Sequence, residues 1–431
     1  MRDGDRNSSF FHKLTEVKKN QNYVHEIQIN GKIINQFDEF KVEATHYFSE
    51  LYTEQPISSD GQILNLVSNS IQSSDNDHLN QVITLEDIKE TVDNMEEDRS
   101  PGPNGYNVNF ISICWGIVKK DLLKMIRKSQ SCNKIRGSTN SAFLALIPKE
   151  KDTKTFDRFR PISLCNIGYK IITKLMALRL KHILPAIIPE NQGGFIKGRK
   201  ILENITLVQE AIHSSLKNGD KGMAVKIDLA NAFDRVSHPF LLQVMLRFGF
   251  DPKFISWVKA CISKPWIAPL VNGRAAPFFQ ATRGLRQGCP LSPLLYAIQA
   301  SVLSFQLEHA RLEQELPGIR LARGVKDINH SQFTDDTILM GGACQIIARR
   351  FKAELNRYCQ ASGSKINLRK SQIFGWNINP REMSDISQIL NINGAVSWDS
   401  FKYLGVPIVK IKSKSSYWNP IVDKIKKKIS G

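Results

Sequence analysis

The sequence predicts an α+β fold divided into two or three sub-domains. The chain has 431 residues, which is more than a single small hydrophobic core usually organises. Apolar, strand-like segments at 142–148 and 223–229 stand among segments of helical periodicity at 169–184 and 202–216. Residues 333–339 add a further signal, because two adjacent carboxylates there separate apolar and β-branched runs. We expect this carboxylate pair near a turn, with one strand leading in and another leading out.

The composition is that of a globular protein. Hydrophobic residues make up 42% of the chain and aromatic residues 9%. No apolar run reaches the length of a membrane span, and no apolar signal segment stands at the N-terminus. The seven cysteines are scattered and form no CxxC pair, which favours a reduced, intracellular protein without a zinc site. We expect it in the nucleus or cytoplasm, and we find no clear targeting signal.

The net charge of +18 is unevenly distributed along the chain. Residues 1–100 hold 9 basic and 19 acidic residues, whereas residues 101–431 hold 50 basic and 22 acidic residues. A strongly basic body behind an acidic head indicates a polyanionic partner such as nucleic acid. The alternative is a soluble protein with an unusual isoelectric point.

Local signals in the first hundred residues predict several elements. Asn30-Gly31 predicts a hairpin turn, and residues 40–51 have helical spacing. Residues 56–80 are rich in Ser, Asn, Asp and Gln, and we expect a linker or mobile loop there. Thr84 followed by Asp87 predicts a capping box at the start of a helix.

Three carboxylates form the candidate metal site. Asp228 ends an otherwise apolar strand, where a carboxylate needs a partner or a metal, and residues 230–236 are expected to turn into a helix. Asp335 and Asp336 follow 107 residues later, and the two segments can meet on adjacent strands. Together they could bind two Mg²⁺ ions about 4 Å apart, which would activate a hydroxyl nucleophile and stabilise a leaving pyrophosphate. The alternative is an ordinary exposed Asp-Asp turn.

The order of motifs along the chain makes a family resemblance specific. The motifs are Pro101-Gly102-Pro103-Asn104-Gly105, Leu146-Ile147-Pro148-Lys149, Arg160-Pro161-Ile162-Ser163-Leu164, Gln192 to Arg199, Ile227-Asp228 to Phe233-Asp234, Arg283 to Pro293, Phe333 to Asp336, Ser362 to Ser371, and Tyr403 to Pro407. This series resembles the reverse transcriptases of non-LTR (LINE-type) retrotransposons, as found in plant genomes. Residues 4–12 are similar to the segment that these elements carry before the fingers.

The resemblance implies a right-hand polymerase fold, with helical fingers and a palm whose antiparallel sheet is flanked by helices. Residues 1–95 would be an N-terminal extension, 96–222 the fingers and 223–408 the palm with motifs A to E. The reverse transcriptase domain would span about 130–408 overall, and 409–431 would begin a truncated thumb. No segment resembles an endonuclease or an RNase H domain, and we expect weak, distributive synthesis from a chain with an incomplete thumb.

The implied activity is RNA-directed DNA synthesis on an RNA template with a DNA primer. Two Mg²⁺ ions, or Mn²⁺ as a substitute, would assist nucleotidyl transfer from a dNTP to the primer 3′-hydroxyl. By resemblance, Asp228 and Asp335 would ligate both ions, and Asp336 would be a lesser ligand or an electrostatic helper. The backbone carbonyl of Leu229 would complete one site.

The resemblance also implies residues that contact the incoming nucleotide. Lys149 and Arg160 would contact the triphosphate, where a planar guanidinium suits phosphate oxygens. Phe233 would lie under the sugar and exclude a 2′-hydroxyl, which favours a dNTP over an rNTP. Gln287 and Gly288 would lie beside the template and the incoming base, because glycine allows close backbone approach.

Two further roles follow from the same resemblance. Lys370 would donate a proton to the leaving pyrophosphate, and Lys365 is its rival. Tyr403, Leu404 and Gly405 would belong to the hairpin that grips the primer.

Some of these residues also have an ordinary structural interpretation, and the chain has rival functions. Phe233 alone would be a core residue, Arg160 a surface ion pair and Lys149 a solvated loop end. The main alternative function is a catalytically inactive, nucleic-acid-binding remnant of a truncated retroelement. An RNA-templated RNA polymerase and a metal-dependent nuclease are further rivals. Phe233 argues against the former, and the stretches Arg283 to Pro293 (motif B of the family) and Tyr403 to Pro407 (motif E) argue against the latter. Thr334 stands where the family more often has Ala.

Overall fold

A computed structural model of the chain describes residues 16, 23–29, 31–56, 61–97, 99–150, 153–410 and 415–429. Its helices and strands confirm the α+β class. The chain divides into two compact units. The first unit draws on 1–54, 81–176 and 256–292, and the second on 55–80, 177–255 and 293–431. None of the helices in the described ranges is both long and apolar enough to cross a bilayer.

The first unit combines one sheet with helices and a small hairpin. Its elements are β1 (Ile27–Ile29), β2 (Lys32–Ile34), α2 (Phe37–Leu51), α5 (Leu85–Asp93), α6 (Val108–Ile113), α7 (Trp115–Cys132), β3 (Ser141–Pro148), η1 (Phe156–Arg158), β4 (Phe159–Cys165), most of α8 (Ile167–Leu180) and of α12 (Pro252–Ile262), β6 (Trp266–Val271), β7 (Arg274–Ala275) and β8 (Phe279–Gln280). The sheet has the order β4-β3-β6-β7, and β8 also pairs with β6. The β3–β4 pair is antiparallel, whereas β3–β6 is parallel.

The core of the first unit lies between α2 and this sheet. Phe40 and Phe48 of α2 pack in one cluster with Leu144 of β3 and Ile267 of β6. Ile27 of the β1–β2 hairpin belongs to the same cluster. Apolar residues recur along α2 at helical spacing, so burial of a single face explains why this segment is a helix.

The second unit is built around a five-stranded sheet. Its elements are α3 (Gly61–Leu64), α4 (Ser73–Asn80), α9 (Leu184–Ile187), α10 (Ile201–Lys217), β5 (Gly222–Ile227), α11 (His238–Phe248), α13 (Ser292–Leu312), β9 (His330–Phe333), β10 (Asp336–Gly342), α14 (Gln345–Ser362), β11 (Gln372–Trp376), α15 (Pro380–Leu390), β12 (Asn393–Ala395), β13 (Ser400–Tyr403), β14 (Val406–Val409), η2 (Ser415–Trp418) and α16 (Asn419–Ile429). The strand order is β12-β11-β5-β10-β9. All neighbours pair antiparallel except β11 and β12.

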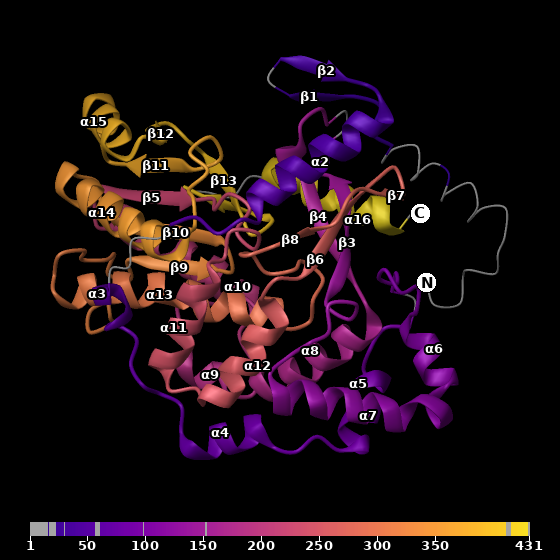
Figure 1. Cartoon of the computed structure of the whole chain (residues 1–431). Coiled ribbons are helices and arrows are strands. Elements are labelled where there is room, and N and C mark those ends of the chain that lie inside the picture. Colours follow the sequence, from indigo (N-terminus) through magenta and orange to yellow (C-terminus); the bar gives the residue numbers. More distant parts are fainter. Residues whose placement is uncertain are drawn as a thin grey trace. The chain divides into compact units, whose positions relative to one another are not determined.

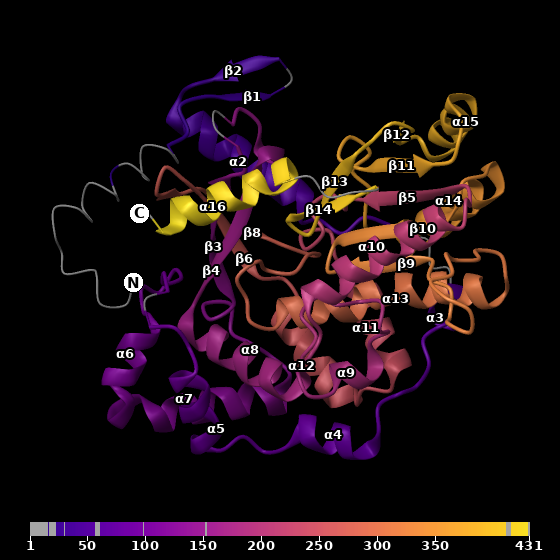
Figure 2. The same ribbon diagram turned by 180° about the vertical axis from the view of Figure 1, so that it is seen from behind.

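Helices cover both faces of the second sheet. Ile338 and Met340 of β10 share a buried cluster with Val208 of α10. Gly341, which points to the opposite face by strand alternation, lies against Ile347 of α14. Figure 1 shows α14 crossing one face, and Figure 2 shows α10 from behind crossing the other. The sheet is therefore a buried middle layer. The candidate carboxylates lie at the ends of its strands.

Several local predictions are confirmed. The capping box is present, because the Asp87 N–H donates to Thr84 Oγ1 at 3.1 Å and the Thr84 N–H donates to Asp87 Oδ2 at 3.0 Å. The strands predicted at 142–148 and 223–229 are β3 and β5, and the helix predicted at 202–216 is α10. Residues 40–51 lie in α2. A hairpin does join β1 and β2, although Asn30 of the predicted turn and residues 4–12 of the family resemblance lie outside the described residues.

The linker expected at 56–80 is wrong in part, because residues 61–64 form helix α3 and residues 73–80 form helix α4. The polar sequence of α4 is held by contacts distant in the chain. Leu79 is buried and its carbonyl accepts a hydrogen bond from Arg179 Nη1 at 3.1 Å. The side chain of Asn76 donates to the carbonyl of Gly249 at 2.9 Å. Tertiary contacts therefore outweigh the poor helix propensity of the segment.

Two helix boundaries also differ from the prediction. The helix expected over 169–184 ends at Leu180, and a separate short helix, α9, follows. Residues 230–236 form turns instead of a helix, since Asn231 has φ of 50°. Helix α11 begins only at His238, where the Ser237 hydroxyl caps it by accepting the Phe240 N–H.

Candidate functional site

The predicted carboxylate pair lies at the turn between β9 and β10, which we call the acidic hairpin (residues 330–342). Phe333 pairs with Asp336 across the two strands, so Thr334 and Asp335 form a two-residue turn. Asp335 is therefore in the turn itself, and Asp336 begins β10. Thr334 has φ of 62° and is buried. This conformation is uncommon for a β-branched residue and costs about 1–3 kcal/mol.

The third carboxylate, Asp228, lies opposite the acidic hairpin. Strand β5 ends at Ile227, which pairs with Thr337 of β10 in the antiparallel register. The same register, continued one residue past the end of β5, places Asp228 across from Asp336. Side chains at facing positions of an antiparallel pair lie about 4.5–5.5 Å apart at Cβ. The adjacency expected from the sequence is thus present, and the register brings Asp228 and Asp336 together.

Burial dominates the electrostatics at these strand ends. Partial burial raises the pKa of Asp336; the positive charge of Lys226 opposes the shift, and the negative charge of Asp228 adds a smaller increase. Burial is also the main reason that the pKa of Tyr296 lies well above its usual value, and Asp335 and Asp336 contribute. A cation bound at this edge would offset the repulsion between the carboxylates.

The donor set suits a hard cation that shares its coordination with substrate. Among the described residues, no group of three or more His, Cys, Asp or Glu side chains is positioned to hold a metal ion unaided. Mg²⁺ in phosphate-transfer sites is usually held by one or two carboxylates, with waters and substrate phosphates supplying the other ligands. Asp228 and Asp336 on facing strands, with Asp335 beside them in the turn, fit that pattern.

The segment 365–371 fixes the backbone of Asp228. The Asp228 N–H donates to Ser371 Oγ at 3.1 Å, and the Asp228 carbonyl accepts the Asn367 N–H at 2.8 Å. The Ala230 N–H donates to the carbonyl of Lys365 at 2.8 Å. Asp228 is therefore held from both sides although strand β5 has already ended.

Leu229 and the two candidate lysines lie along the same segment. Leu229 bridges Ile366, and the hydrogen bonds of this bridge come from the flanking residues, so the bridge does not use the Leu229 carbonyl. That carbonyl is the predicted metal ligand. The side chains of Lys365 and Lys370 are both exposed. Both remain candidates for the proton donor.

Phe233, the predicted sugar gate, has a fixed ring. It stacks on Tyr296 with ring centroids 4.7 Å apart and an interplanar angle of 15°. The ring of Phe195 meets it edge-on at 6.5 Å. Tyr296 is fully buried and comes from α13, so Phe233 rests on the core. Phe233 itself is half-buried, which leaves part of the side chain accessible.

Lys149 and Arg160 lie at the same end of the β3–β4 ladder in the first unit. Arg160 pairs with Ile147, and Lys149 follows β3 directly. Both side chains are exposed. The Lys149 ammonium donates to the carbonyl of Asp157 at 2.9 Å. The two residues thus lie near one end of the same strand pair, and their predicted contact with a triphosphate stays a prediction.

Gln287 and Gly288 lie against β4, also in the first unit. The Gln287 carbonyl accepts the Ser163 N–H at 2.7 Å. Gly288 has φ of 104°, and a Cβ there would lie 3.0 Å from the Ser163 carbonyl oxygen, so only glycine fits without strain. Arg286 anchors this loop: it is buried, donates to Asn140 Oδ1 at 2.6 Å and lies over the ring of Tyr169 at 3.7 Å.

The predicted site residues therefore form two groups. Asp228, Leu229, Phe233, Asp335 and Asp336 belong to the second unit, together with both candidate lysines. Lys149, Arg160, Gln287 and Gly288 belong to the first unit. Each group is built within its own unit.

The predicted primer-grip residues form a second two-residue turn, between β13 and β14, which we call the Leu-Gly hairpin (residues 400–409). Tyr403 pairs with Val406, and Leu404 and Gly405 between them have φ of 47° and 91°. The side chain of Tyr403 is fully buried and its hydroxyl lies 3.4 Å from Ser331 Oγ. Burial raises the pKa of Tyr403 well above its usual value. Leu404 is thus partly exposed and Gly405 exposed, whereas the Tyr403 ring is buried.

Two residues that contact the predicted site were not themselves predicted as parts of it. Tyr296 supports Phe233, and nothing in its helical context signals this contact. Gln192 forms hydrogen bonds with the backbone of Thr334. Gln192 begins the motif Gln192 to Arg199, but the motif does not reveal this partner.

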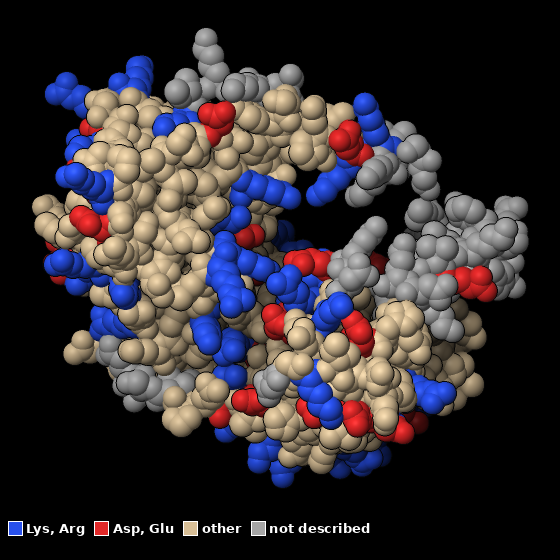
Figure 3. All heavy atoms as spheres, turned by 90° about the horizontal axis from the view of Figure 1, so that it is seen from above, with Lys and Arg blue, Asp and Glu red and all other residues tan. Residues whose placement is uncertain are grey.

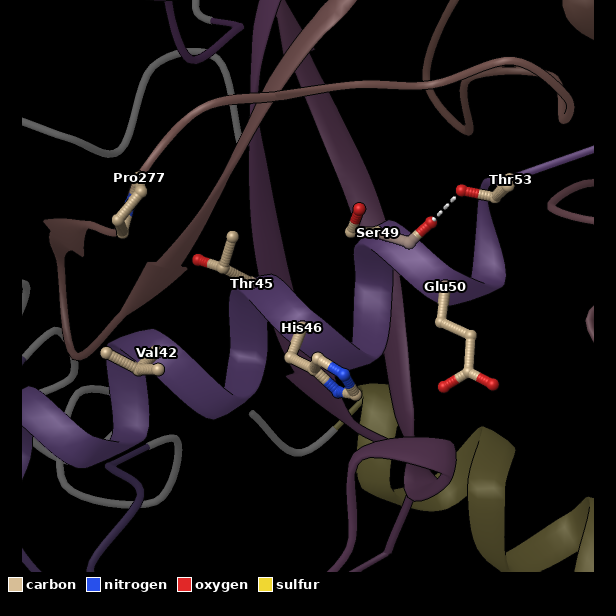
Figure 4. A pocket seen from close by; sticks show the side chains of 7 residues that line it. All are labelled: Val42, Thr45, His46, Ser49, Glu50, Thr53 and Pro277. Carbon is tan, nitrogen blue, oxygen red and sulfur yellow. Dashed lines mark hydrogen bonds between the residues drawn. The ribbon is translucent and has the colours of Figure 1, made fainter.

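Other surface features do not add to the site. A hollow of about 490 Å³ in the first unit is lined by Val42, Thr45, His46, Ser49, Glu50, Thr53 and Pro277 (Figure 4). It contains none of the predicted site residues. Figure 3 shows Lys and Arg side chains spread over one face of the molecule with Asp and Glu among them. This agrees with the basic composition of the chain.

Comparisons with known proteins identify the family. The fold and the site describe an α+β protein with carboxylates at the adjoining ends of two antiparallel strands, β5 and β10. The profile of the family described as "Reverse transcriptase (RNA-dependent DNA polymerase)" matches residues 147–408. The chain belongs to this family.

The relatives of the chain include proteins named after transposable and mobile elements. It is 27% identical over 375 residues to the "Transposon TX1 uncharacterized 149 kDa protein" of Xenopus laevis, covering 86% of this chain and 28% of the relative. It is 23% identical over 372 residues to the Pol polyprotein of the retrotransposable element R2DM of Drosophila melanogaster, covering 84% and 33%. It is 23% identical over 337 residues to the "RNA-directed DNA polymerase from mobile element jockey" of Drosophila melanogaster, covering 76% and 35%. The chain spans about a third of the length of these relatives.

Proposed function

We propose that the chain is an RNA-directed DNA polymerase, the reverse transcriptase of a LINE-type retroelement. It would transfer a nucleotide from a dNTP to the 3′-hydroxyl of a DNA primer on an RNA template, in the nucleus or cytoplasm. The observation that carries this proposal is the register of β5 and β10, which sets Asp228 opposite Asp336 with Asp335 in the adjoining turn. Membership of the reverse transcriptase family supports it, as does the naming of the jockey relative as an RNA-directed DNA polymerase.

The proposed right-hand architecture follows the chain order. Residues 96–222 would be the fingers and 223–408 the palm, preceded by an extension over 1–95 and followed by the start of a thumb at 409–431. The antiparallel arrangement of β11, β5, β10 and β9, covered by helices on both faces, supports the palm assignment. Lys149 and Arg160 would bind the triphosphate from the fingers.

Asp228, Asp335 and Asp336, with the Leu229 carbonyl, would hold two Mg²⁺ ions, for which Mn²⁺ can substitute. The ions would lower the pKa of the attacking hydroxyl and neutralise charge on the phosphates. The protein's own contribution is positional: Ser371 and Asn367 fix the backbone of Asp228.

The remaining residues would select and orient the nucleotide. The ring of Phe233, held by Tyr296, would contact the sugar where a 2′-hydroxyl would otherwise lie. Gln287 and Gly288 would lie beside the template and the incoming base. Lys370, or Lys365 in its place, would protonate the leaving pyrophosphate. Leu404 and Gly405 would contact the primer.

Primer extension tests the polymerase assignment. The purified chain, with a primed RNA template, dNTPs and Mg²⁺, should extend the primer. Asp335→Ala should lower the rate by roughly 10³-fold or more, since metal ions stabilise the transition state by several kcal/mol. Asp385→Ala is the matched control, because Asp385 is an exposed carboxylate on α15 in the same unit. Extension that survives Asp335→Ala would refute the metal assignment, and binding of nucleic acid without any extension would favour the inactive remnant.

Sugar selection offers a second test. Phe233→Ala should raise incorporation of rNTP relative to dNTP by roughly 10- to 200-fold, the range expected when a pocket loses steric discrimination against one small group. The ratio of the two incorporation efficiencies is the measurement, so a general loss of activity does not affect it. An unchanged ratio would contradict the gate assignment.

A further inference from the structure

The turn of the acidic hairpin is held in an unfavourable backbone conformation. Thr334 combines φ of 62° with a β-branched side chain and is only 6% exposed. Such residues are uncommon at positive φ. They persist where the surrounding structure over-determines them, and they cluster at functional sites. The next residue along the chain is Asp335, so the conformation of Thr334 sets the direction in which this carboxylate leaves the turn.

The side-chain amide of Gln192 binds both sides of this residue. The Thr334 N–H donates to Gln192 Oε1 at 2.9 Å, and Gln192 Nε2 donates to the Thr334 carbonyl at 3.5 Å. Gln192 is 0% exposed, so water does not compete for these bonds. The Gly194 N–H also donates to Gln192 Oε1, at 3.1 Å, which fixes the orientation of the amide.

Gln192 is itself rigidly held. The guanidinium of Arg199 donates to the carbonyls of Gln192 and Ile188, each at 2.6 Å, and also to that of Pro189. The Gly193 N–H donates to the Gln332 carbonyl at 2.8 Å, which ties the segment to β9. The side chain of Gln192 therefore reaches the turn from a fixed platform, and a flexible side chain could not hold a strained backbone.

Close approach of this platform requires its two glycines. A Cβ at Gly194 would lie 2.3 Å from Thr334 Oγ1 and 2.6 Å from the Thr334 nitrogen. A Cβ at Gly193 would lie 2.1 Å from Oδ1 of Asn204, whose amide donates to Ser331 Oγ of β9 at 2.9 Å. The glycines that look like ordinary turn residues in the sequence thus permit the contact with the acidic hairpin.

A second amide contributes from within the hairpin. Gln332 Nε2 donates to the Thr334 carbonyl at 3.5 Å, and Ser304 of α13 donates to Gln332 Oε1 at 2.8 Å. Gln332 belongs to strand β9 of the hairpin itself, whereas Gln192 belongs to a different segment. Of these two amides, Gln192 is the one that accepts the Thr334 N–H.

We infer that Gln192 is a positioning residue for Asp335. Its amide holds Thr334 at positive φ and so directs the Asp335 carboxylate toward the metal ions; this step rests on the proposed polymerase function. Arg199 and the two glycines support Gln192 in that role. The metal affinity of the site therefore depends on a residue that does not touch the metal.

A double-mutant cycle between Gln192 and Thr334 tests this inference. Gln192→Met keeps the approximate size of the side chain but removes both hydrogen bonds to Thr334, together with the one from the Gly194 N–H. The hydrogen bonds between the Gln192 amide and the Thr334 backbone are called the clamp. Thr334→Gly removes the need for this clamp, because glycine adopts positive φ without strain. Binding of Mn²⁺ followed by electron paramagnetic resonance reports on the site without any turnover. We expect Gln192→Met to bind Mn²⁺ about tenfold more weakly, as loss of about 1.4 kcal/mol of hydrogen bonding would produce, and the double variant to recover to within about threefold.

A matched control separates positioning from a general loss of packing. Gln209 of α10 makes the same two-sided contact with a backbone, since its Nε2 donates to the Val409 carbonyl at 2.8 Å and its Oε1 accepts the Val409 N–H at 2.9 Å. Gln209→Met removes equivalent bonds from a different hairpin. We expect it to leave Mn²⁺ affinity unchanged. If Gln192→Met does not fold, Gln192→Asn replaces it, since that amide is one methylene too short to reach Thr334.

The outcomes decide the inference and keep it separate from the polymerase proposal. Wild-type Mn²⁺ affinity in Gln192→Met, or a double variant as weak as Gln192→Met, would overturn the inference. If the wild-type chain binds no Mn²⁺, the proposed function has failed, and thermal unfolding of the same four proteins then tests the clamp. The clamp predicts that Gln192→Met lowers Tm less in the Thr334→Gly background than in wild type. Equal shifts in the two backgrounds would refute it.

Discussion

The acidic hairpin and the Leu-Gly hairpin reach a similar turn by different means. Both have a two-residue turn whose first residue has positive φ, Thr334 in one and Leu404 in the other. In the Leu-Gly hairpin the second turn residue is Gly405, and a Cβ there would meet no atom within 4 Å. A turn with two residues at positive φ that ends in glycine is favoured by its own local chemistry. The acidic hairpin has no glycine in its turn.

The acidic hairpin is instead held by contacts with distant segments. His330, Ser331 and Gln332 of β9 are all 0% exposed. Asn191 reaches His330 Nε2 at 3.2 Å, and Asn204 donates to Ser331 Oγ at 2.9 Å. Buried polar groups need such partners, because burial without a hydrogen bond is unfavourable. The comparison shows that a turn can be specified by local sequence in one place and by tertiary contacts in another.

The largest effect that would separate the two hairpins comes from Gly194→Ala. The new methyl group would overlap the nitrogen and hydroxyl of Thr334, and we expect a loss of about 3 kcal/mol in the free energy of unfolding, the upper part of the range for overpacking. Urea denaturation is the measurement. Gly61→Ala is the control, since that Cβ would meet nothing within 4 Å. A Gly194→Ala protein as stable as wild type would contradict the tertiary account of the acidic hairpin.

A pH-dependent effect is expected at His330. Burial lowers the pKa of His330 to about 4 from an ordinary value near 6.5. The unfolded state therefore binds more protons between these values, so stability is complete above about pH 6.5 and declines as the pH falls toward 4. Between pH 7.5 and pH 5 the wild-type chain should lose about 2 kcal/mol through this residue. Urea denaturation at both pH values should show that the free energy of unfolding falls less in His330→Gln than in wild type.

Glu308 also makes the free energy of unfolding depend on pH, but in a lower pH range than His330 does. A hydrogen bond from Arg311 lowers the pKa of Glu308 to about 2. Its contribution to stability is present above about pH 4.5 and is lost only as the pH falls through 2. The difference between wild type and His330→Gln over the interval from pH 7.5 to pH 5 therefore reports on His330. Equal losses in wild type and His330→Gln would show that His330 is not buried as a neutral side chain.

The smallest effect is expected in the Leu-Gly hairpin. Gly405 has φ of 91° in open space, so Gly405→Ala adds only the backbone penalty of about 1 kcal/mol for a side chain in this region. The free energy of unfolding should fall by that amount. The affinity of the variant for Mn²⁺ should equal that of wild type. A loss as large as that of Gly194→Ala would mean that the two turns are held in the same way.

Short-range rules explain which parts of the fold were predictable. The Thr84–Asp87 capping box, strands β3 and β5, helix α10 and the presence of a hairpin at Asp335 all depend on residues within a few positions of one another. The errors have the same origin. Residues 73–80 look like a linker locally but form a helix because Arg179 and Leu79 are brought together. Residues 230–236 look like the start of a helix but turn at Asn231.

The sequence by itself determined the family resemblance, the α+β class, and which carboxylates are candidates for the metal site. Only the tertiary structure decided that Asp228 faces Asp336 in the β5–β10 register, that Phe233 rests on Tyr296, and that Gln192 holds Thr334. These pairs are 63 to 142 residues apart in the chain. No periodicity or turn rule acts over such distances. These contacts therefore form only when the strands pair and the core packs.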